Sequence, residues 1–242
     1  MKNLVRLAVL FAVLFSLSAC GPRETWNYLV LGGATQEYAT KFPEAYAAFI
    51  EKDQRVIVEM DYYTGYSPGW ILEQMDASQN LRDLIVNAEV ITFDWDPGAI
   101  KGEYAFLQGT CGGEDNQDCL RADYQKAKED WIAMLDKLIT LRNGDTSGMW
   151  QIIMGSWPYL VHYPDVTPEQ LDVMRGYFQD MSSFLMEEAE RREIEYVKVF
   201  DGEYLHEKPP PAEWVNGLRL TEEGDRIVLE ALKKIEFEKS AK

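Results

Sequence analysis

The stretch Tyr28-Leu29-Val30-Leu31-Gly32-Gly33-Ala34-Thr35 is a short apolar run that ends at two adjacent glycines. A run of this length and composition is typical of a strand that is buried on both faces of a sheet. Four more runs of this kind follow along the chain. Together the predicted strands are Tyr28 to Leu31, Val56 to Tyr62, Val90 to Trp95, Trp150 to Met154 and Ile194 to Phe200. Five strands are the number that a flavodoxin-like sheet requires.

Helical patterns separate the predicted strands. Apolar residues recur at helical spacing over Glu37 to Lys52, Gly69 to Asn87 with a break near Ser78, Leu120 to Leu141, Thr167 to Arg192 and Thr221 to Phe237. Strands that alternate with helices predict a parallel sheet covered on both faces. We therefore expect one α/β domain over residues 28–242, a three-layer αβα flavodoxin-like fold with five parallel strands. Ligands of such folds bind beyond the carboxyl ends of the strands.

The N-terminal segment has the features of a bacterial lipoprotein signal. Lys2 and Arg6 form a basic region, and residues 7–17 are almost uninterruptedly apolar but too few to span a bilayer comfortably. Leu17-Ser18-Ala19-Cys20 then matches a lipobox. We expect a signal peptide over 1–19, a lipidated Cys20 and tether over 20–27, and a domain outside the cytoplasm on a bacterial cell membrane or outer membrane. The alternative is an ordinary signal peptide followed by an incidental cysteine.

The mature chain is strongly acidic. Hydrophobic residues make up 46% of the sequence and charged residues 27%, which is compatible with a packed core. The net charge of −17 becomes −19 once Lys2 and Arg6 leave with the signal peptide. Such a surface repels nucleic acid and anionic lipid headgroups. We therefore expect no nucleic-acid partner, and membrane attachment through the N-terminal lipid alone.

Cys111 and Cys119 are the two cysteines that remain besides Cys20. In an exported protein an isolated pair this close predicts a disulfide. A metal pair is the alternative, but no third or fourth ligand of the right type accompanies it. We expect no metal and no cofactor.

Two stretches at opposite ends of the chain resemble sequence blocks of the SGNH (GDSL-type) hydrolases. Leu31-Gly32-Gly33-Ala34-Thr35 is similar to the first block, Gly-Asp-Ser-Leu, which carries the nucleophilic serine. Asn216-Gly217-Leu218-Arg219-Leu220-Thr221-Glu222-Glu223-Gly224 is similar to the last block, which carries aspartate and histidine three apart. Ala34, Asn216 and Arg219 stand at the three catalytic places. Alanine has no nucleophile, asparagine is neutral and arginine stays protonated, so the resemblance implies a member without the catalytic triad.

The blocks between these ends extend the resemblance. Tyr63-Thr64-Gly65-Tyr66-Ser67-Pro68-Gly69-Trp70-Ile71-Leu72 resembles the second block, and Gly65 keeps the place of the glycine amide that points into the oxyanion hole. In the third block, over residues 88–99, Asp96 stands at the family's glycine and Gly98 at its asparagine, so a donor is lost and a carboxylate is added. Residues 109–120 look like an insertion of certain bacterial secreted members. The resemblance runs from about Tyr28 to Leu232.

A relocated catalytic set would depend on few residues. His162 and His206 are the only histidines, and both follow predicted strands. Asp94 and Asp96 lie two apart at a strand end, which would suit a carboxylate pair or a divalent cation. Ser67 offers a hydroxyl, but no base is placed for it. The alternative is that the histidines are solvated loop residues and that the strand-end aspartate caps or turns the chain.

Aromatic residues cluster near the second block. Tyr62, Tyr63, Tyr66 and Trp70 would line a sugar-binding cleft or belong to the core, and core is the commoner role of aromatics at strand ends and on helix faces. The candidate cleft residues are Gly33, Ala34, Gly65, Ser67, Asp94, Asp96, Trp157, His162 and Arg219.

The sequence predicts a non-catalytic binding or assembly component of the cell envelope, which uses the cleft for a carbohydrate, acyl or peptide ligand. The alternative is a diverged esterase or acylhydrolase with relocated catalytic residues, and a third hypothesis is a scaffold without a cleft. Two hypotheses concern the role of Arg219 in the cleft. In the first, Arg219 forms an ion pair with Asp94 or Asp96, and this pair fills the site. In the second, Arg219 and the backbone amides of the Gly32 to Thr35 loop form a pocket that favours anions.

Overall fold

The computed structural model describes residues 23–32, 41–63, 67–94, 101–153, 166–199, 215–216, 219–235 and 237. Five strands form one sheet in the order β2-β1-β3-β4-β5, and every neighbouring pair is parallel. The strands are β1 (Thr25–Leu31), β2 (Ile57–Tyr63), β3 (Val90–Asp94), β4 (Met149–Ile153) and β5 (Glu195–Lys198). The predicted five-stranded parallel sheet is therefore confirmed.

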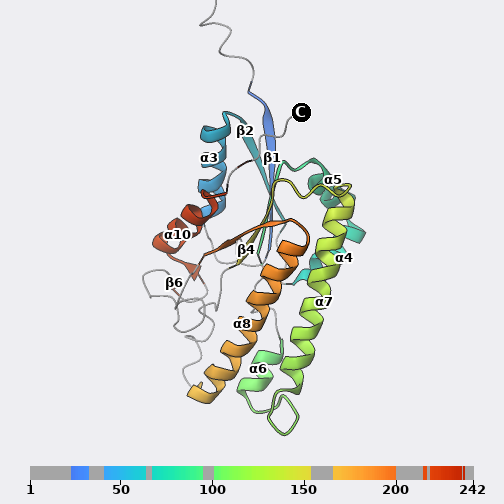
Figure 1. Cartoon of the computed structure of the whole chain (residues 1–242), viewed down its shortest axis with the longest axis vertical. Coiled ribbons are helices and arrows are strands. Elements are labelled where there is room, and N and C mark those ends of the chain that lie inside the picture. The colour runs from blue at the N-terminus through green and yellow to red at the C-terminus, as the bar shows by residue number, and fades with distance from the viewer. Residues whose placement is uncertain are drawn as a thin grey trace, which may run out of the picture.

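Helices cover both faces of the sheet (Figure 1). One face packs against α3 (Phe42–Gln54) and α10 (Glu222–Leu232). The other face packs against α4 (Pro68–Ala77), α5 (Gln79–Asn87), α7 (Asp118–Leu141) and α8 (Pro168–Arg191). Each face buries its own apolar cluster, and the three-layer arrangement is confirmed.

Hydroxyl side chains set three of the helix starts. Ser78 ends α4, and its Oγ accepts a hydrogen bond from Leu81 N at 3.2 Å to begin α5. Thr167 forms a capping box with Gln170 at the start of α8, and Thr221 Oγ1 accepts from Gly224 N at the start of α10. The predicted break near Ser78 and the predicted starts at both threonines are confirmed, because these side chains supply the acceptor that a helix N-terminus lacks.

The structure corrects the predicted elements in several places. α10 ends at Leu232, five residues before the predicted end of that helix at Phe237. β1 begins at Thr25, so three residues assigned to the tether belong to the sheet. A short helix, α6 (Lys101–Leu107), lies in a stretch with no helical prediction. A small antiparallel pair, β6 (Val215–Asn216) and β7 (Arg219–Leu220), precedes α10 and was also not predicted.

The guanidinium of Arg142 organises the edge of the sheet where β3 and β4 begin. It donates to Ile85 O at 3.2 Å and Ala88 O at 2.6 Å, just before β3. It also donates to Asp145 O at 3.0 Å and Ser147 O at 2.8 Å, just before β4. The Arg142 side chain is only 6% exposed, so little water can reach these carbonyls to donate hydrogen bonds in its place. Arg142 therefore satisfies four acceptors from two separate connections.

Arg142→Met should lower the free energy of unfolding by about 3 kcal/mol, because it removes a buried cation from four carbonyl partners. Chemical denaturation of the purified domain measures this loss. Arg121→Met is the matched control, since Arg121 is half exposed and pairs with Asp115 and Asp118 at the surface. It should leave the midpoint unchanged. Equal effects of the two substitutions would contradict the role given to Arg142.

The helices α7 and α8 run well beyond the strands, at the end of the molecule opposite to the start of β1 (Figure 1). Their N-terminal ends pack against each other and against α6, and we call this region, residues 101–124 and 168–178, the distal arm. The rings of Tyr124 and Tyr177 lie 4.7 Å apart, and Gln170 Nε2 donates to Leu107 O at 3.1 Å. The buried apolar residues of the distal arm, among them Phe106, Leu120 and Met174, belong to the same cluster as the sheet residues of that face. The core of that face therefore continues from the sheet into the arm.

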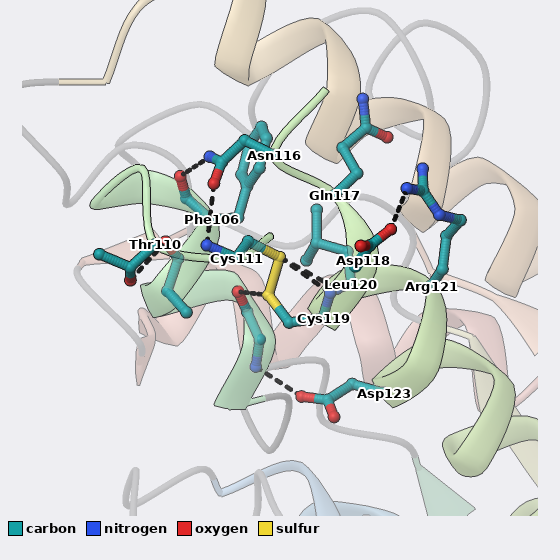
Figure 2. The surroundings of a disulfide bond; sticks show 12 residues. Phe106, Thr110, Cys111, Asn116, Gln117, Asp118, Cys119, Leu120, Arg121 and Asp123 are labelled. Carbon is teal, nitrogen blue, oxygen red and sulfur yellow. Dashed lines mark hydrogen bonds and ion pairs between the residues drawn. A yellow bond between two sulfur atoms is a disulfide. The ribbon is translucent and has the colours of Figure 1, made fainter. Parts of the chain in front are cut away.

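A disulfide between Cys111 and Cys119 closes the turn between α6 and α7 (Figure 2). Around it, Cys111 N donates to Asn116 Oδ1 at 2.8 Å, and Asn116 Nδ2 donates to Phe106 O at 2.8 Å. Asp123 Oδ2 accepts from Gly102 N at 2.5 Å, which holds α6 against α7. The pairing predicted from the sequence is confirmed, and the bond stabilises the connection on which α6 depends.

Replacing both cysteines, Cys111→Ala with Cys119→Ala, should lower the free energy of unfolding by about 2.5 kcal/mol on the chain-entropy model. The native protein should also react with no thiol reagent at these positions until it is reduced. Thiol counting before and after reduction, together with chemical denaturation, measures both. Free thiols in the freshly purified, unreduced domain would show that the pairing is wrong.

Candidate functional site

The carboxyl ends of the five parallel strands meet at one edge of the sheet. The last residues of the strands are Leu31, Tyr63, Asp94, Ile153 and Lys198. This edge is where ligands bind in open α/β sheets, because the loops that leave the strands diverge there. The predicted cleft residues follow these strand ends in the sequence, so the fold is consistent with the predicted location of the site.

Asp94 and Gly32 lie against each other at this edge. β1 and β3 are neighbours, with Leu31 opposite Phe93, so the next residues of both chains are adjacent. The Asp94 side chain is buried, and its Oδ1 lies 1.5 Å from where a Cβ of residue 32 would be. Gly32 also has a φ of +141°, which side chains other than glycine rarely adopt. Only glycine can therefore stand at position 32 while the carboxylate occupies this space.

Two more polar side chains lie beneath Asp94 on the same face of the sheet. Tyr28 Oη and Thr92 Oγ1 form a hydrogen bond of 2.9 Å in the core on the α3 and α10 side. Burial raises the pKa of the Tyr28 hydroxyl well above its usual value, and the nearby Asp94 carboxylate adds a smaller rise. Tyr28 therefore stays neutral at every physiological pH and acts as a hydrogen-bonding core residue.

Asp225 binds the N-terminus of α3 from the first turn of α10. Its carboxylate accepts hydrogen bonds from Lys41 N at 3.1 Å and Phe42 N at 3.3 Å. Desolvation raises the pKa of Asp225, and the two backbone amides oppose that rise. The first amides of α3 are thus already paired with an anion of the chain itself, and they are not available to an external anion.

The same contact places the last sequence block beside the start of α3. Asp225 lies six residues after Arg219 in the sequence, and Lys41 lies seven residues after Ala34. In the β6–β7 pair, Asn216 is directly opposite Arg219. The sequence reasoning missed Asp225, although an acidic residue in the first turn of a helix is a signal for contacts with backbone amides.

Ser67 has a structural role in the part of the chain that the structure describes. Its Oγ accepts a hydrogen bond from Trp70 N at 3.2 Å and caps α4. Tyr63 stacks on Trp70 with ring centroids 5.9 Å apart, and both pack against the apolar cluster of that face. Tyr62 packs against the opposite cluster and donates to Glu44 Oε1 at 2.7 Å. These aromatics favour the core alternative over the sugar-binding one.

Several predicted site residues lie outside the described residues. They are Cys20, Gly33, Ala34, Gly65, Tyr66, Asp96, Gly98, Trp157, His162 and His206. For Asn216 and Arg219 the backbone alone is described. The ion-pair plug and the relocated catalytic set therefore remain predictions. Among the described residues, no group of three or more metal-binding side chains is found.

Comparison with solved structures identifies the fold. The lipase Lip_vut3 from a goat rumen metagenome superposes with a TM-score of 0.66 at 14% identity, covering 88% of this chain and 99% of the lipase. Phospholipase A1 from Streptomyces albidoflavus gives 0.56 at 14% identity, covering 86% and 98%. A lipolytic protein of the G-D-S-L family from Veillonella parvula gives 0.51 at 12% identity, covering 87% and 97%. The chain has the fold of the SGNH (GDSL-type) hydrolases. No protein-family model and no curated protein sequence matches it.

Gly32→Ala should lower the free energy of unfolding by about 3 kcal/mol, because the new methyl group meets Asp94 and the backbone must change its φ. The loss should be smaller in an Asp94→Ala background, where the steric part is gone. Gly176→Ala is the control, since Gly176 lies on the exposed side of α8 with nothing within 4 Å of its missing Cβ. It should be neutral or slightly stabilising. Thermal denaturation of the four variants tests this, and equal losses for Gly32→Ala and Gly176→Ala would refute the contact.

Proposed function

We propose that this protein is a cell-envelope lipoprotein that uses an SGNH-hydrolase-like domain to bind a ligand without hydrolysing it. The observation that carries the proposal is the identity of three residues, Ala34, Asn216 and Arg219, at the places of the serine, aspartate and histidine of the family. Hydrolysis by this fold needs an activated nucleophile and a base, and neither alanine nor arginine supplies one. The ligand is a carbohydrate, an acyl group or a peptide.

The geometry of the described residues supports this assignment of places. The contact between Asp225 and the first amides of α3 brings the start of α10, which follows the last sequence block, beside the start of α3, which follows the first block in the chain. A site formed by the two blocks together would require this arrangement of the two helices.

Asp96 also supports a binding role, because it stands at the place of a family glycine in the third sequence block. A carboxylate near a developing oxyanion would oppose its negative charge. Asp94 belongs to the same block, and its side chain is buried beside Gly32 at the end of β3.

The lipobox Leu17-Ser18-Ala19-Cys20 supports attachment through a lipid. Among the described helices, none combines the length and the hydropathy that crossing a bilayer requires. A covalent lipid on Cys20 would hold the domain at the membrane surface, and the strongly acidic domain itself would remain in water.

The purified domain from Gly21 onward should hydrolyse short aryl esters no faster than a matched inert protein, and fluorophosphonate probes should not label it. Ala34→Ser should remain inactive, because an unassisted serine is a poor nucleophile and Arg219 offers no base. Esterase assays and in-gel probe detection measure this. Labelling of any serine in the native protein would favour the alternative, a diverged esterase or acylhydrolase with relocated catalytic residues.

The full-length protein, expressed in bacteria, should incorporate a fatty-acid analogue and partition with membranes. Cys20→Ser should abolish the incorporation and the cleavage after Ala19, because the thiol is the site of acylation. Cys111→Ser, which leaves the lipobox intact, is the control and should be labelled like the wild type. Equal labelling of Cys20→Ser and wild type would mean that the protein is not a lipoprotein of this kind.

A further inference from the structure

The chain enters the sheet at the edge opposite the candidate site. Thr25, the first residue of β1, pairs with Ile57 at the start of β2, whereas Asp94 and Gly32 lie at the carboxyl edge. Seven residues of extended strand separate the two edges by about 20 Å. Figure 1 shows β1 beginning at one end of the molecule and the distal arm at the other.

The distal arm lengthens this separation. α7 has 24 residues and is about 36 Å long, and its C-terminus leads into the start of β4 at the amino edge. Its N-terminal end therefore lies about 15 Å beyond the carboxyl edge. α8 has the same length and direction, and it packs beside α7 through the Tyr124–Tyr177 contact and the ion pair of Lys128 with Asp180.

The covalent tether is short by comparison. Four residues lie between Cys20 and Thr25, and the five steps from one residue to the other span at most about 18 Å when fully extended. A lipid on Cys20 therefore holds the amino edge near the bilayer surface. The tip of the distal arm would touch the same bilayer only if the domain lay on its side. A net charge of −19 opposes that arrangement on a membrane with anionic headgroups.

We propose that the candidate site and the distal arm face away from the anchoring membrane. The ligand then reaches the site from the aqueous side, and lipids of the anchoring bilayer are excluded as ligands. This inference rests on the lipid anchor proposed above. It narrows the ligand classes, because an acyl group that stays in that bilayer cannot reach an edge that lies about 20 Å beyond the start of β1 in an upright domain.

Single-thiol variants of the lipidated, full-length protein test the orientation. Asp53→Cys places a thiol near the end of α3, at the amino edge, and Glu169→Cys places one in the first turn of α8, at the distal arm. Both replace an exposed acid, so their effects on net charge are equal. Because Cys20 carries the lipid and Cys111 is paired with Cys119, the added thiol is the only one that accepts a dye.

The labelled proteins are inserted into vesicles of phosphatidylcholine and phosphatidylglycerol that contain an acceptor-labelled lipid. Energy transfer should be at least about twofold more efficient from position 53 than from position 169, because about 30 Å or more separates them along the sheet and arm. Equal transfer, or stronger transfer from position 169, overturns the orientation.

Flotation of the same vesicles separates this inference from its premise. If the protein floats with the vesicles but energy transfer is equal from both positions, the protein has its lipid anchor and only the proposed orientation is refuted. Protein that does not float and carries no lipid refutes the lipoprotein proposal, and the orientation falls with it.

Discussion

The fold depends on one buried cation at the amino edge of its sheet. Arg142 donates hydrogen bonds to carbonyls at the end of α5 and to carbonyls that precede β4, and these bonds fix where β3 and β4 begin. Close beside it, Gly148 has a φ of 71°, and a Cβ there would lie 1.9 Å from Glu89 O. β3 is the central strand of the sheet. A change in where β3 begins at the amino edge would therefore shift the residues at its other end, including Asp94 at the carboxyl edge.

The two edges of the sheet thus have different roles. Backbone hydrogen bonds and a close approach at Gly148 hold the amino edge. At the carboxyl edge, the described contacts include the packing of Asp94 on Gly32 and the pairing of Asp225 with the start of α3. The chain shares the SGNH-hydrolase fold with structural neighbours to which its sequence identity is only 10–14%.

Local patterns in the sequence predicted most of the architecture, because the strands are apolar runs and the helices begin at hydroxyl caps such as Ser78 and Thr167. α6 escaped prediction since a seven-residue helix has too few turns to be stable by itself. Its stability comes from Asp123 and from the disulfide, which act through tertiary contacts. β1 starts earlier than predicted for a similar reason. Thr25 and Asn27, on either side of Trp26, are polar and interrupt the apolar run, but β2 and Glu89 supply partners for the backbone of this stretch.

The candidate site was less predictable than the fold. The resemblance of the sequence blocks to those of the family predicts that Ala34, Asn216 and Arg219 stand at the catalytic places, and this stays a prediction because the side chains of these residues lie outside the described structure. The sequence blocks did not indicate that Ser67 would cap α4 or that Asp225 would reach α3. Asp225 and Lys41 are 184 residues apart, and only the packing of α10 beside α3 brings them together. No spacing within a single sequence encodes such a contact.

The distal arm has a further consequence for how the molecule opens. The N-terminal ends of α7 and α8 lie beyond the strands (Figure 1), so their order depends on contacts with α6 and with each other, among them the Tyr124–Tyr177 contact and the disulfide. Such a region forms a cooperative unit with a lower opening free energy than the sheet. Its amide protons should exchange with solvent through local unfolding, and reduction of the disulfide should speed that exchange while the five strands stay protected. The redox state of the Cys111–Cys119 pair would then control the rigidity of the arm.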